Sequence, residues 1–352
     1  MDKRCAIFNY WWAWGDAHGA SLTALALYKL IEELGYKPCL IMTVFKGMDV
    51  EQCKRGRHFK FISQYAKYSE KNYQTGEDYE ELNSQFQHFI VGSDQVLRLE
   101  WVPDEWFLYS ISSSKNKIMM SGSFGGNQIN ASEQRINRVA EYLQDFSAVS
   151  VREKDGIEVY YRYFGKRDDL EWIMDPVFLI HPHFYKELIN QNLRCDEFEQ
   201  CAKESILFYI LDYTPEIECL KKKISVQYNV NIIEDSEDLR AEDFLYLVDN
   251  CKMVITDSFH GMCFSIILNR PFYCVYNKMR GTSRVDTIRE LLGLNSVVFD
   301  LESVPSCEFD IPQIDYNRIN GILEKERERG KNWLKNNLQK NVREENEDEK
   351  VR

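Results

Sequence analysis

The chain has 352 residues, of which 44% are hydrophobic and 28% are charged, and its formal net charge is −12. This length favours two domains over one small core, and the acidic excess argues against general binding of nucleic acid. No apolar run reaches the length of a membrane span, and the first residues lack the apolar segment and cleavage site of a signal peptide. We therefore expect a cytoplasmic protein whose ten cysteines are reduced thiols.

The first half of the chain alternates short apolar runs with helical patterns. We expect strands at residues 5–8, 38–43, 89–91, 117–120, 148–151 and 172–174, and helices at residues 22–34 and 132–143. Residues 45–85 are polar and aromatic without a clean period, so we expect a mobile, irregular insertion with short helices there. The repeated order of strand, polar loop and helix indicates a parallel sheet with crossover helices.

A second series of the same kind follows. Its expected strands are residues 205–211, 231–233, 253–256 and 272–276, and its expected helices are residues 215–228, 241–250, 262–268 and 284–292. Two such series predict an α/β protein with two Rossmann-like domains facing a cleft. We divide the chain into an N-terminal domain at residues 1–178, a C-terminal domain at residues 179–314, and a C-terminal helix and charged tail at residues 315–352.

The last of these segments has an apolar stripe at helical spacing among charged residues. The stripe consists of Ile319, Ile322, Leu323, Trp333, Leu334 and Leu338. One interpretation is a helix that packs back on the first domain, and the other is a helix that rests on the membrane surface. We prefer packing, because the stripe is narrow and Glu324, Glu326 and Glu328 would be repelled by anionic lipid.

The segment around His260 is the most informative for function. Residues 253–256 form an apolar strand, residues 259–261 are expected to make a tight turn, and a helix is expected to follow. His260 would then lie between the carboxyl end of a strand and the amino end of a helix, where ligands and anions bind in open α/β sheets. A histidine there can donate a proton to a phosphorylated substrate, and Gly261 would let a ligand approach the backbone. The alternative is a loop histidine bonded to a carbonyl group.

Four other polar loops follow expected strands, at residues 14–16, 92–95, 121–123 and 152–153. Glycine and serine at such points can hold a phosphate or carboxylate with backbone N–H groups, which makes Ser93, Gln95 and Ser123 candidates for substrate binding. Asp16 and Asp94 are candidates to accept a proton from a sugar hydroxyl, with helix capping as the alternative.

Arg152 directly follows a strand, and its forked guanidinium suits a carboxylate or phosphate. The alternative is a salt bridge to Glu153 or Asp155. The aromatic run at residues 10–14 has three interpretations: stacking on a sugar ring, contact with a membrane, or packing in the core. No group of cysteines and histidines has the spacing of a zinc site, so we expect no metal.

Six segments occur in an order that resembles the polysaccharide pyruvyl transferase family. They are VGSDQV, SGSFG, SVREKDGIEVY, DPVFLI, FLYLVDNCKMVITDSFHGMCFSIILNRPF and SRVDTIRELLGL. The resemblance runs from Ile7 to Leu294, with residues 45–85 poorly matched. It implies a two-domain fold like that of GT-B glycosyltransferases. It also implies transfer of pyruvate from phosphoenolpyruvate to a sugar of a cell-surface polysaccharide precursor, such as a capsule or exopolysaccharide, with formation of a ketal and release of phosphate.

The resemblance also implies roles for single residues. Arg152 matches the arginine of the family's vR-D/E motif, His260 the motif histidine, and Arg284 the basic residue before the late helix. Many members have arginine two residues before the histidine, where this chain has Ser258, so Arg284 or Arg280 is the expected replacement.

In this scheme His260 is the candidate general acid, and Asp94 and Asp16 are the candidate bases. The expected substrate-binding residues are Arg152, Arg284, Ser258, Gly261, Ser93, Gln95 and Ser123. No step needs a metal or an organic cofactor. The expected partners are phosphoenolpyruvate and a sugar acceptor, not nucleic acid. Lipid linkage of the acceptor and peripheral association with the inner face of the membrane stay open.

Two other functions stay open. A GT-B glycosyltransferase using a nucleotide sugar would share the fold, but it would ordinarily need acidic or amide side chains for the ribose and base in the second domain, and none stands out after Gly261. A non-catalytic binding protein of polysaccharide assembly would have little reason to retain His260 and Arg152.

Overall fold

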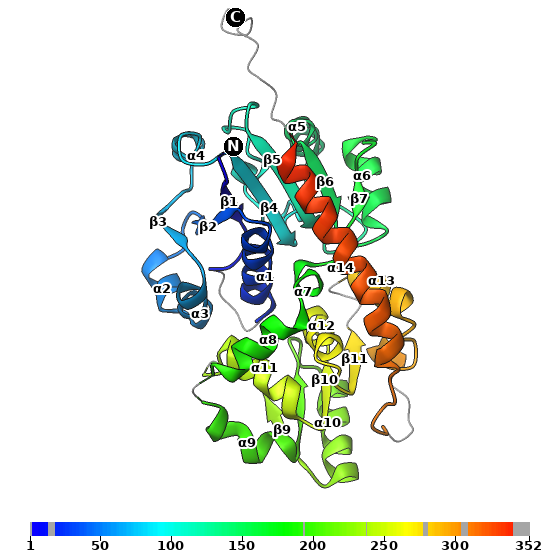
Figure 1. The fold of residues 1–352 in the computed structure, drawn as a ribbon. Helices are drawn as coiled ribbons and strands as arrows, with labels where there is room; N and C mark the ends of the chain where they lie inside the picture. The colour runs from blue at the N-terminus through cyan, green and yellow to red at the C-terminus, as the bar shows by residue number, and fades with distance from the viewer. Residues whose placement is uncertain are drawn as a thin grey trace, which may run out of the picture.

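The computed structural model describes residues 2–12, 18–192, 194–236, 238–276, 281–303 and 309–340. Two sheets organise these residues, one above the other in Figure 1. Every strand pair in both sheets is parallel. Parallel strands need crossover connections and are buried on both faces, which agrees with the long apolar runs of the central strands.

The first sheet has seven strands in the order β3-β2-β1-β4-β5-β6-β7. They are β1 (Arg4–Phe8), β2 (Lys37–Met42), β3 (Tyr68–Asn72), β4 (His88–Asp94), β5 (Asn116–Gly122), β6 (Ala148–Val151) and β7 (Glu171–Trp172). The helices of this part are α1 (Gly19–Glu33), α2 (Val50–Arg55), α3 (Arg57–Tyr65), α4 (Gly76–Leu82), the 3-10 helix η1 (Asp104–Phe107), α5 (Glu133–Gln144), α6 (Gly156–Phe164) and α7 (Pro176–Leu179).

The second sheet has five strands in the order β12-β11-β10-β8-β9. They are β8 (Ser205–Tyr209), β9 (Asn231–Glu234), β10 (Met253–Thr256), β11 (Phe272–Tyr276) and β12 (Val298–Asp300). The accompanying helices are α8 (Pro182–Asn190), α9 (Cys195–Lys203), α10 (Pro215–Tyr228), α11 (Ala241–Asn250), α12 (Phe259–Ile267), α13 (Ser283–Leu292), the 3-10 helix η3 (Leu301–Ser303) and α14 (Tyr316–Gln339).

At residues 45–85 the expected short helices are confirmed, but the expected irregularity is wrong. This segment forms α2, α3 and α4, and its strand β3 extends the first sheet by pairing with β2. The sequence of β3 is YSEKN, and it lies at the sheet edge with half-buried or exposed side chains. A polar edge strand carries no apolar signal, and helices of six to nine residues are too short to show a clear period.

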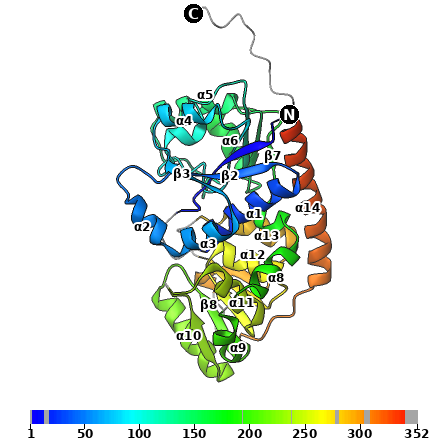
Figure 2. The same cartoon turned by 60° about the vertical axis from the view of Figure 1, so that its left-hand side comes forward.

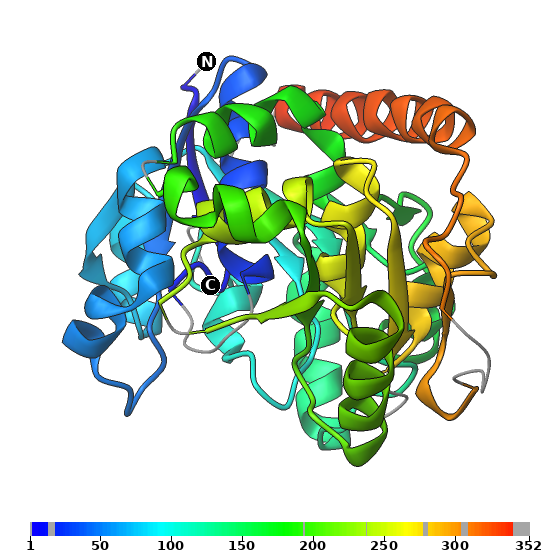
Figure 3. The same cartoon turned by 90° about the horizontal axis from the view of Figure 1, so that it is seen from below.

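Helix α14 connects the two halves of the molecule. It runs from beside the second sheet to the first, along one side of the molecule in Figures 1 and 2. Seen from below, it lies at the edge opposite α2 and α3 (Figure 3). Gly330 packs so closely on α7 that a Cβ there would lie 2.6 Å from Leu179. The hydroxyl of Tyr36 donates to the carbonyl of Leu338 at 3.1 Å.

This packing decides between the two interpretations of the C-terminal helix. Ile319, Leu323, Trp333, Leu334 and Leu338 are all buried. A helix resting on a membrane would need these side chains exposed. Within the described residues no helix is both long and apolar enough to cross a bilayer. The charged end at residues 341–352 lies outside the described residues.

The packing of α14 also affects how the chain is divided into domains. Because α14 packs on β5 and α7, the part of the molecule built on the first sheet takes residues from both ends of the chain. We keep residues 1–178, 179–314 and 315–352 as our proposed division, with the last segment assigned to the first sheet by its packing.

Candidate active site

The order of the strands indicates where a ligand would bind. In the first sheet the chain moves outward from β1 through β2 and β3, and then returns to place β4 on the other side of β1. In the second sheet β8 and β10 stand in the same relation. Ligands of open α/β sheets bind outside the carboxyl ends of the strands at such reversals. The residues that follow β4 and β10 are therefore the first place to look for a site.

The carboxylate of Asp175 gathers side chains from both parts of the molecule. Its Oδ2 atom accepts from Nη1 of Arg152 at 2.7 Å and from the hydroxyl of Ser93 at 3.2 Å. The same oxygen lies 3.7 Å from Nε2 of His260. Its Oδ1 atom accepts the N–H of Val177 at 3.1 Å. Asp175 is only 1% exposed, so this carboxylate lies in a nearly water-free centre.

Burial alone would raise the pKa of Asp175, but the neighbours reverse the effect. The neighbouring imidazole of His260 and the charge of Arg152 hold this pKa well below its usual range. Asp175 is thus an anion at any physiological pH, and it can orient both Arg152 and His260.

His260 belongs to the part built on the second sheet, and its side chain contacts the part built on the first sheet. Its Nε2 atom lies 2.9 Å from the hydroxyl of Thr23 on α1. Its ring also lies against Gly19, where a Cβ would come within 2.0 Å of Nδ1. The first turns of α1 and α12 therefore meet at this ring, which is 8% exposed.

The local structure around His260 differs from the expected tight turn. Helix α12 already begins at Phe259, which places His260 in its first turn. Ser258 is the N-cap, and its side chain accepts the N–H of Gly261 at 3.4 Å. This side-chain cap lets the helix start two residues before Gly261.

The structure gives a packing reason for the glycine at position 261. A Cβ at Gly261 would lie 2.3 Å from Oγ1 of Thr256 and 2.8 Å from the ring of Tyr209. Glycine is needed there because α12 packs closely on β8 and β10.

Arg152 has two carboxylate partners, neither of which is Glu153 or Asp155. Nη1 donates to Asp175, and Nη2 donates to Asp94 at 3.2 Å. Burial would lower the pKa of Arg152, but the two carboxylates raise it above its usual range. Within the described residues its Nε has no hydrogen-bond partner. The guanidinium carbon also lies 4.8 Å from the ring centroid of Phe259.

Arg284 also lies near the ring of Phe259. It belongs to the first turn of α13, is half-buried, and places its guanidinium carbon 6.0 Å from the centroid of Phe259. Its charge acts on Glu153, which is buried and accepts a hydrogen bond from the hydroxyl of Ser123. Burial raises the pKa of Glu153 against the opposing charges of Arg152 and Arg284. Glu153 is thus a buried carboxyl group with a shifted pKa beside two arginines, which is typical of functional sites.

The remaining candidates lie around this centre or outside the described part of the chain. Asp94, at the end of β4, accepts from the N–H of Gln95 at 3.0 Å as well as from Arg152. The side-chain oxygen of Gln95 is taken by Arg98 at 3.0 Å. Asp16 and Arg280 lie outside the described residues.

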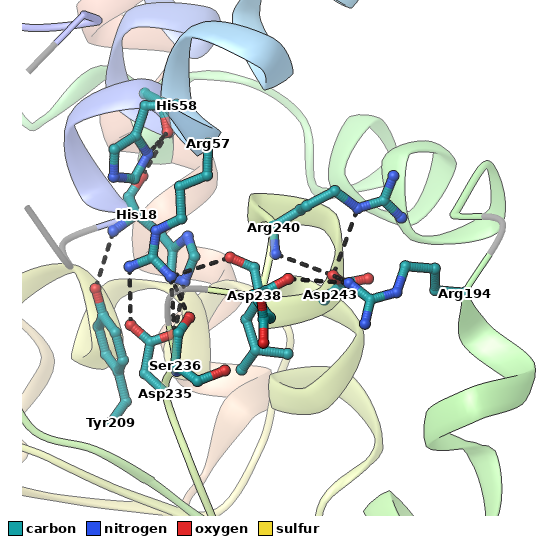
Figure 4. Close-up of polar contacts among 12 residues, drawn as sticks. His18, Arg57, His58, Arg194, Tyr209, Asp235, Ser236, Asp238, Arg240 and Asp243 are labelled. Atoms are coloured by element: carbon teal, nitrogen blue, oxygen red, sulfur yellow. Dashed lines mark hydrogen bonds and ion pairs between the residues drawn. The ribbon is translucent and has the colours of Figure 1, made fainter. Parts of the chain in front are cut away.

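A second polar cluster joins the two parts of the molecule at the amino end of α1 (Figure 4). Nε2 of His18 lies 3.0 Å from Asp235, which follows β9. Arg57 of α3 donates to the same carboxylate, with Nη2 3.2 Å from Oδ2. The hydroxyl of Tyr209 accepts the backbone N–H of His18 at 3.1 Å. The cluster therefore ties α1 and α3 to the ends of β8 and β9.

The side chains of this cluster differ in their charge states. His18 is fully buried, and burial lowers its pKa despite the neighbouring carboxylate. Burial would raise the pKa of Asp235, but its hydrogen bond to His18 and the charge of Arg57 lower it. The consistent arrangement is a neutral His18 that donates to an ionised Asp235, with Arg57 as the cation.

Sequence reasoning missed Asp175, Thr23, His18 and Asp235. Asp175 had a usable signal, because it is an acidic residue soon after a strand, like Asp94. It is part of the family-like segment DPVFLI, but no role was predicted for it. His18 and Asp235 had no usable signal in the sequence, because their contact spans 217 residues.

Metal-ligating side chains do not gather in groups of three or more anywhere in the described residues. The described part of the aromatic run is mostly packed inside, since Trp11 and Trp12 are buried. Tyr10 contacts Trp106 at a centroid distance of 4.8 Å.

Three solved structures share this fold over almost the whole chain. UDP-N-acetylglucosamine 2-epimerase from Rickettsia bellii is 12% identical, with a TM-score of 0.55 and coverage of 96% of this chain and 97% of that one. The Methanocaldococcus jannaschii UDP-GlcNAc 2-epimerase, solved with UDP-GlcNAc and UDP, is 12% identical, with a TM-score of 0.52 and coverage of 93% and 94%. Anabaena HepE, solved with UDP and glucose, is 10% identical, with a TM-score of 0.51 and coverage of 96% and 94%.

At such low identity the likeness concerns the fold alone. It confirms the expected α/β architecture with two Rossmann-like halves of the GT-B type. None of the curated proteins compared with the chain gives a match. A family model described as polysaccharide pyruvyl transferase matches residues 18–279. That range contains His260, Asp175 and Arg152, whereas Arg284 lies just beyond it.

Proposed function

Because the chain belongs to the polysaccharide pyruvyl transferase family, we propose that it moves pyruvate from phosphoenolpyruvate onto a sugar of a polysaccharide precursor, forming a ketal and releasing phosphate. The family makes the protein a transferase of polysaccharide biosynthesis. The observation that supports the proposed chemistry is the buried contact of Asp175 with Arg152 and His260, between the two strand reversals.

The reaction needs a proton on carbon first. Protonation of the methylene carbon of phosphoenolpyruvate turns it into a methyl group and makes the neighbouring carbon electrophilic. A sugar hydroxyl then attacks that carbon. A second hydroxyl closes the ketal as the bond to phosphate breaks, so that phosphate leaves with the oxygen. One hydroxyl proton replaces the proton given to carbon, and the other leaves with the phosphate.

His260 is the proposed general acid. Its ring sits in the first turn of α12, with Nε2 near the anionic Asp175 and the hydroxyl of Thr23. These two neighbours fix the orientation of the ring, as a positioned acid requires. Thr23 and Asp175 are the proposed positioning residues.

The donor is a small, highly charged anion, and the protein is acidic overall. Binding therefore needs local positive potential. Arg284, Arg152 and the N-terminus of α12 are the proposed sources. Arg284 lies in the first turn of α13 and its charge also acts on Glu153, whereas Arg152 is already paired with Asp94 and Asp175. Arg152 would then act mainly by holding the two carboxylates in place.

Asp94 is the proposed base toward the sugar hydroxyl, and Asp16 is kept as a second candidate. Asp94 is the more exposed partner of Arg152, with 17% of its side chain exposed against 0% for Asp175. An acceptor hydroxyl can therefore reach it more easily.

The direct test measures phosphate release from phosphoenolpyruvate with acceptors that end in galactose, mannose or glucosamine. Proton NMR of the product should show a new methyl singlet from the ketal. Release of a nucleotide from UDP-sugars, without any reaction of phosphoenolpyruvate, would replace this proposal with a glycosyltransferase. Binding of phosphoenolpyruvate without turnover on any acceptor would favour a non-catalytic role.

A further inference from the structure

An aromatic pocket lies beside the first sheet, away from His260. It has a volume of about 260 Å³ and is formed by the segments that follow β2 and β3, by α4, and by the chain around η1. Its aromatic lining consists of Phe45, Tyr73, Tyr79, Trp101 and Trp106. Five aromatic rings around one small space are unusual for a surface that only faces water.

Trp101 is an exposed ring that is held in place. Its side chain is 55% exposed, although tryptophan is usually buried. The guanidinium carbon of Arg98 lies 3.8 Å from the centroid of its indole. This stacking fixes the ring while leaving much of it open to a ligand, at little cost in side-chain entropy.

Trp106 gives an independent indication of a ligand. It is fully buried, and in the described part of the chain its indole N–H has no hydrogen-bond partner. A buried indole N–H normally has an acceptor. Trp106 lines the pocket, so a hydroxyl group bound there can supply the missing acceptor.

The charges of the pocket indicate which substrate it fits. Lys46 and Glu105 line it, one cation and one anion. Phosphoenolpyruvate carries several negative charges and needs an excess of cations, which this pocket lacks. Aromatic rings combined with balanced polar groups suit a neutral polyhydroxylated ring, whose C–H face stacks and whose hydroxyls form hydrogen bonds.

The pocket also contacts the active-site loop. The ring of Tyr10 packs on Trp106 and Phe45, with centroid distances of 4.8 and 6.1 Å. The hydroxyl of Tyr10 donates to the carbonyl of Gln95 at 3.4 Å, and Gln95 follows Asp94. One side chain thus separates the pocket from the loop that carries the proposed base.

We propose that this aromatic pocket is the acceptor subsite and holds one neutral sugar ring of the polysaccharide precursor. The identification of that sugar as the acceptor rests on the proposed function. The volume lies just below the range of roughly 300–1,000 Å³ for drug-sized ligands, which matches a single ring better than an oligosaccharide.

The test separates sugar binding from catalysis. Saturation-transfer NMR with methyl galactoside, methyl mannoside and N-acetylglucosamine is run without phosphoenolpyruvate on the wild type, Trp101→Ala and Trp101→Phe. We expect at least one sugar to bind the wild type, about 3–10-fold weaker binding in Trp101→Ala, and partial rescue in Trp101→Phe. Tyr213→Ala is the matched control, because Tyr213 is 49% exposed and lies beside the second sheet.

Steady-state kinetics of Trp101→Ala then test whether the bound sugar is the acceptor. In Trp101→Ala the KM for the acceptor should rise by about 3–10-fold, while kcat and the KM for phosphoenolpyruvate stay within about twofold. An unchanged acceptor KM in an active enzyme, or no sugar bound by the wild type, would overturn the subsite. Sugar binding that depends on Trp101 in a protein unable to use phosphoenolpyruvate would support the sugar site and refute the proposed function.

Discussion

Gly19 and His260 touch across the boundary between the two halves of the molecule, so closely that a Cβ at Gly19 would lie 2.0 Å from Nδ1 of the imidazole. Replacing glycine by alanine in a helix normally stabilises it by about 0.5–1 kcal/mol. In Gly19→Ala the added methyl group would instead displace His260. We expect a loss of about 1–3 kcal/mol in the free energy of unfolding and reduced turnover, measured by urea denaturation and phosphate release.

Gly321 in α14 is the matched control, because a Cβ there would meet nothing within 4 Å. Gly321→Ala should be neutral or stabilising, with unchanged turnover. Equal stability and activity in the two variants would show that Gly19 and His260 are not in contact.

The second prediction concerns His260 itself. His260→Gln should lower turnover by about 10²–10⁴-fold, as expected when a general acid is lost, with little change in the urea midpoint. His183→Gln is the control, since 72% of the His183 side chain is exposed. Near-normal phosphate release in His260→Gln would rule out the proposed acid.

Asp175 and Asp94 should differ in their effect on stability. Asp175→Asn removes the buried partner of Arg152 and should cost about 3–5 kcal/mol. Asp94→Asn should cost clearly less, because 17% of its side chain reaches solvent and Arg152 keeps Asp175. Chemical denaturation at pH 7 of both variants tests this order. A smaller loss for Asp175→Asn than for Asp94→Asn would contradict the central position of Asp175.

The fourth prediction is a pH dependence that arises from His18. Burial lowers the pKa of His18 in the folded protein, whereas in the unfolded chain it is about 6.5. The unfolded state therefore takes up a proton first. The stability contribution is present above about pH 6.5 and is lost as the pH falls toward the folded pKa. The groups facing His18 are Asp235, Arg57 and Asp243.

Stability measured at pH 7.5 and pH 5.5 checks this expectation. His18→Gln should be less stable at pH 7.5 but should lose less on acidification than the wild type. His183→Gln, which removes an exposed histidine, should keep the wild-type difference. If His18→Gln kept the wild-type difference in stability between the two pH values, a group other than His18 would cause the pH dependence.

The fifth prediction concerns α14. A chain ending at residue 315 should have a lower melting temperature, because it uncovers the apolar surface that Leu323, Trp333, Leu334 and Leu338 bury. A chain ending at residue 340 retains the whole helix and is the matched control. If both truncated chains melted at the same temperature as the full protein, α14 would not be packed as described.

Sequence patterns were reliable where an element's own residues determine it. The boundaries of α10, α11 and β10 agree with those predicted from the hydrophobic pattern. Sequence patterns failed to predict β3, whose polar residues are held in a strand by pairing with β2. An edge strand of that kind is set by its neighbour and not by its own composition.

The active site was predictable only in part for a similar reason. The rule that ligands bind at strand ends selected the loops of Ser93, Asp94, Arg152 and His260, and the structure brings these residues together around Asp175. The contact of Thr23 with His260 spans 237 residues. No local pattern carries such a contact, because it depends on how the two sheets face each other.

The position of α14 has a consequence for the synthesis of this chain on the ribosome. Helix α7 ends at Leu179, and the helix that covers it begins only at Tyr316, after every strand of the second sheet. At about 5–20 residues per second, a ribosome needs on the order of 10 s to make the intervening chain. For that time Leu179 and the rest of the surface beneath α14 lack their cover. The first sheet therefore becomes fully enclosed only after every strand of the second sheet has been made.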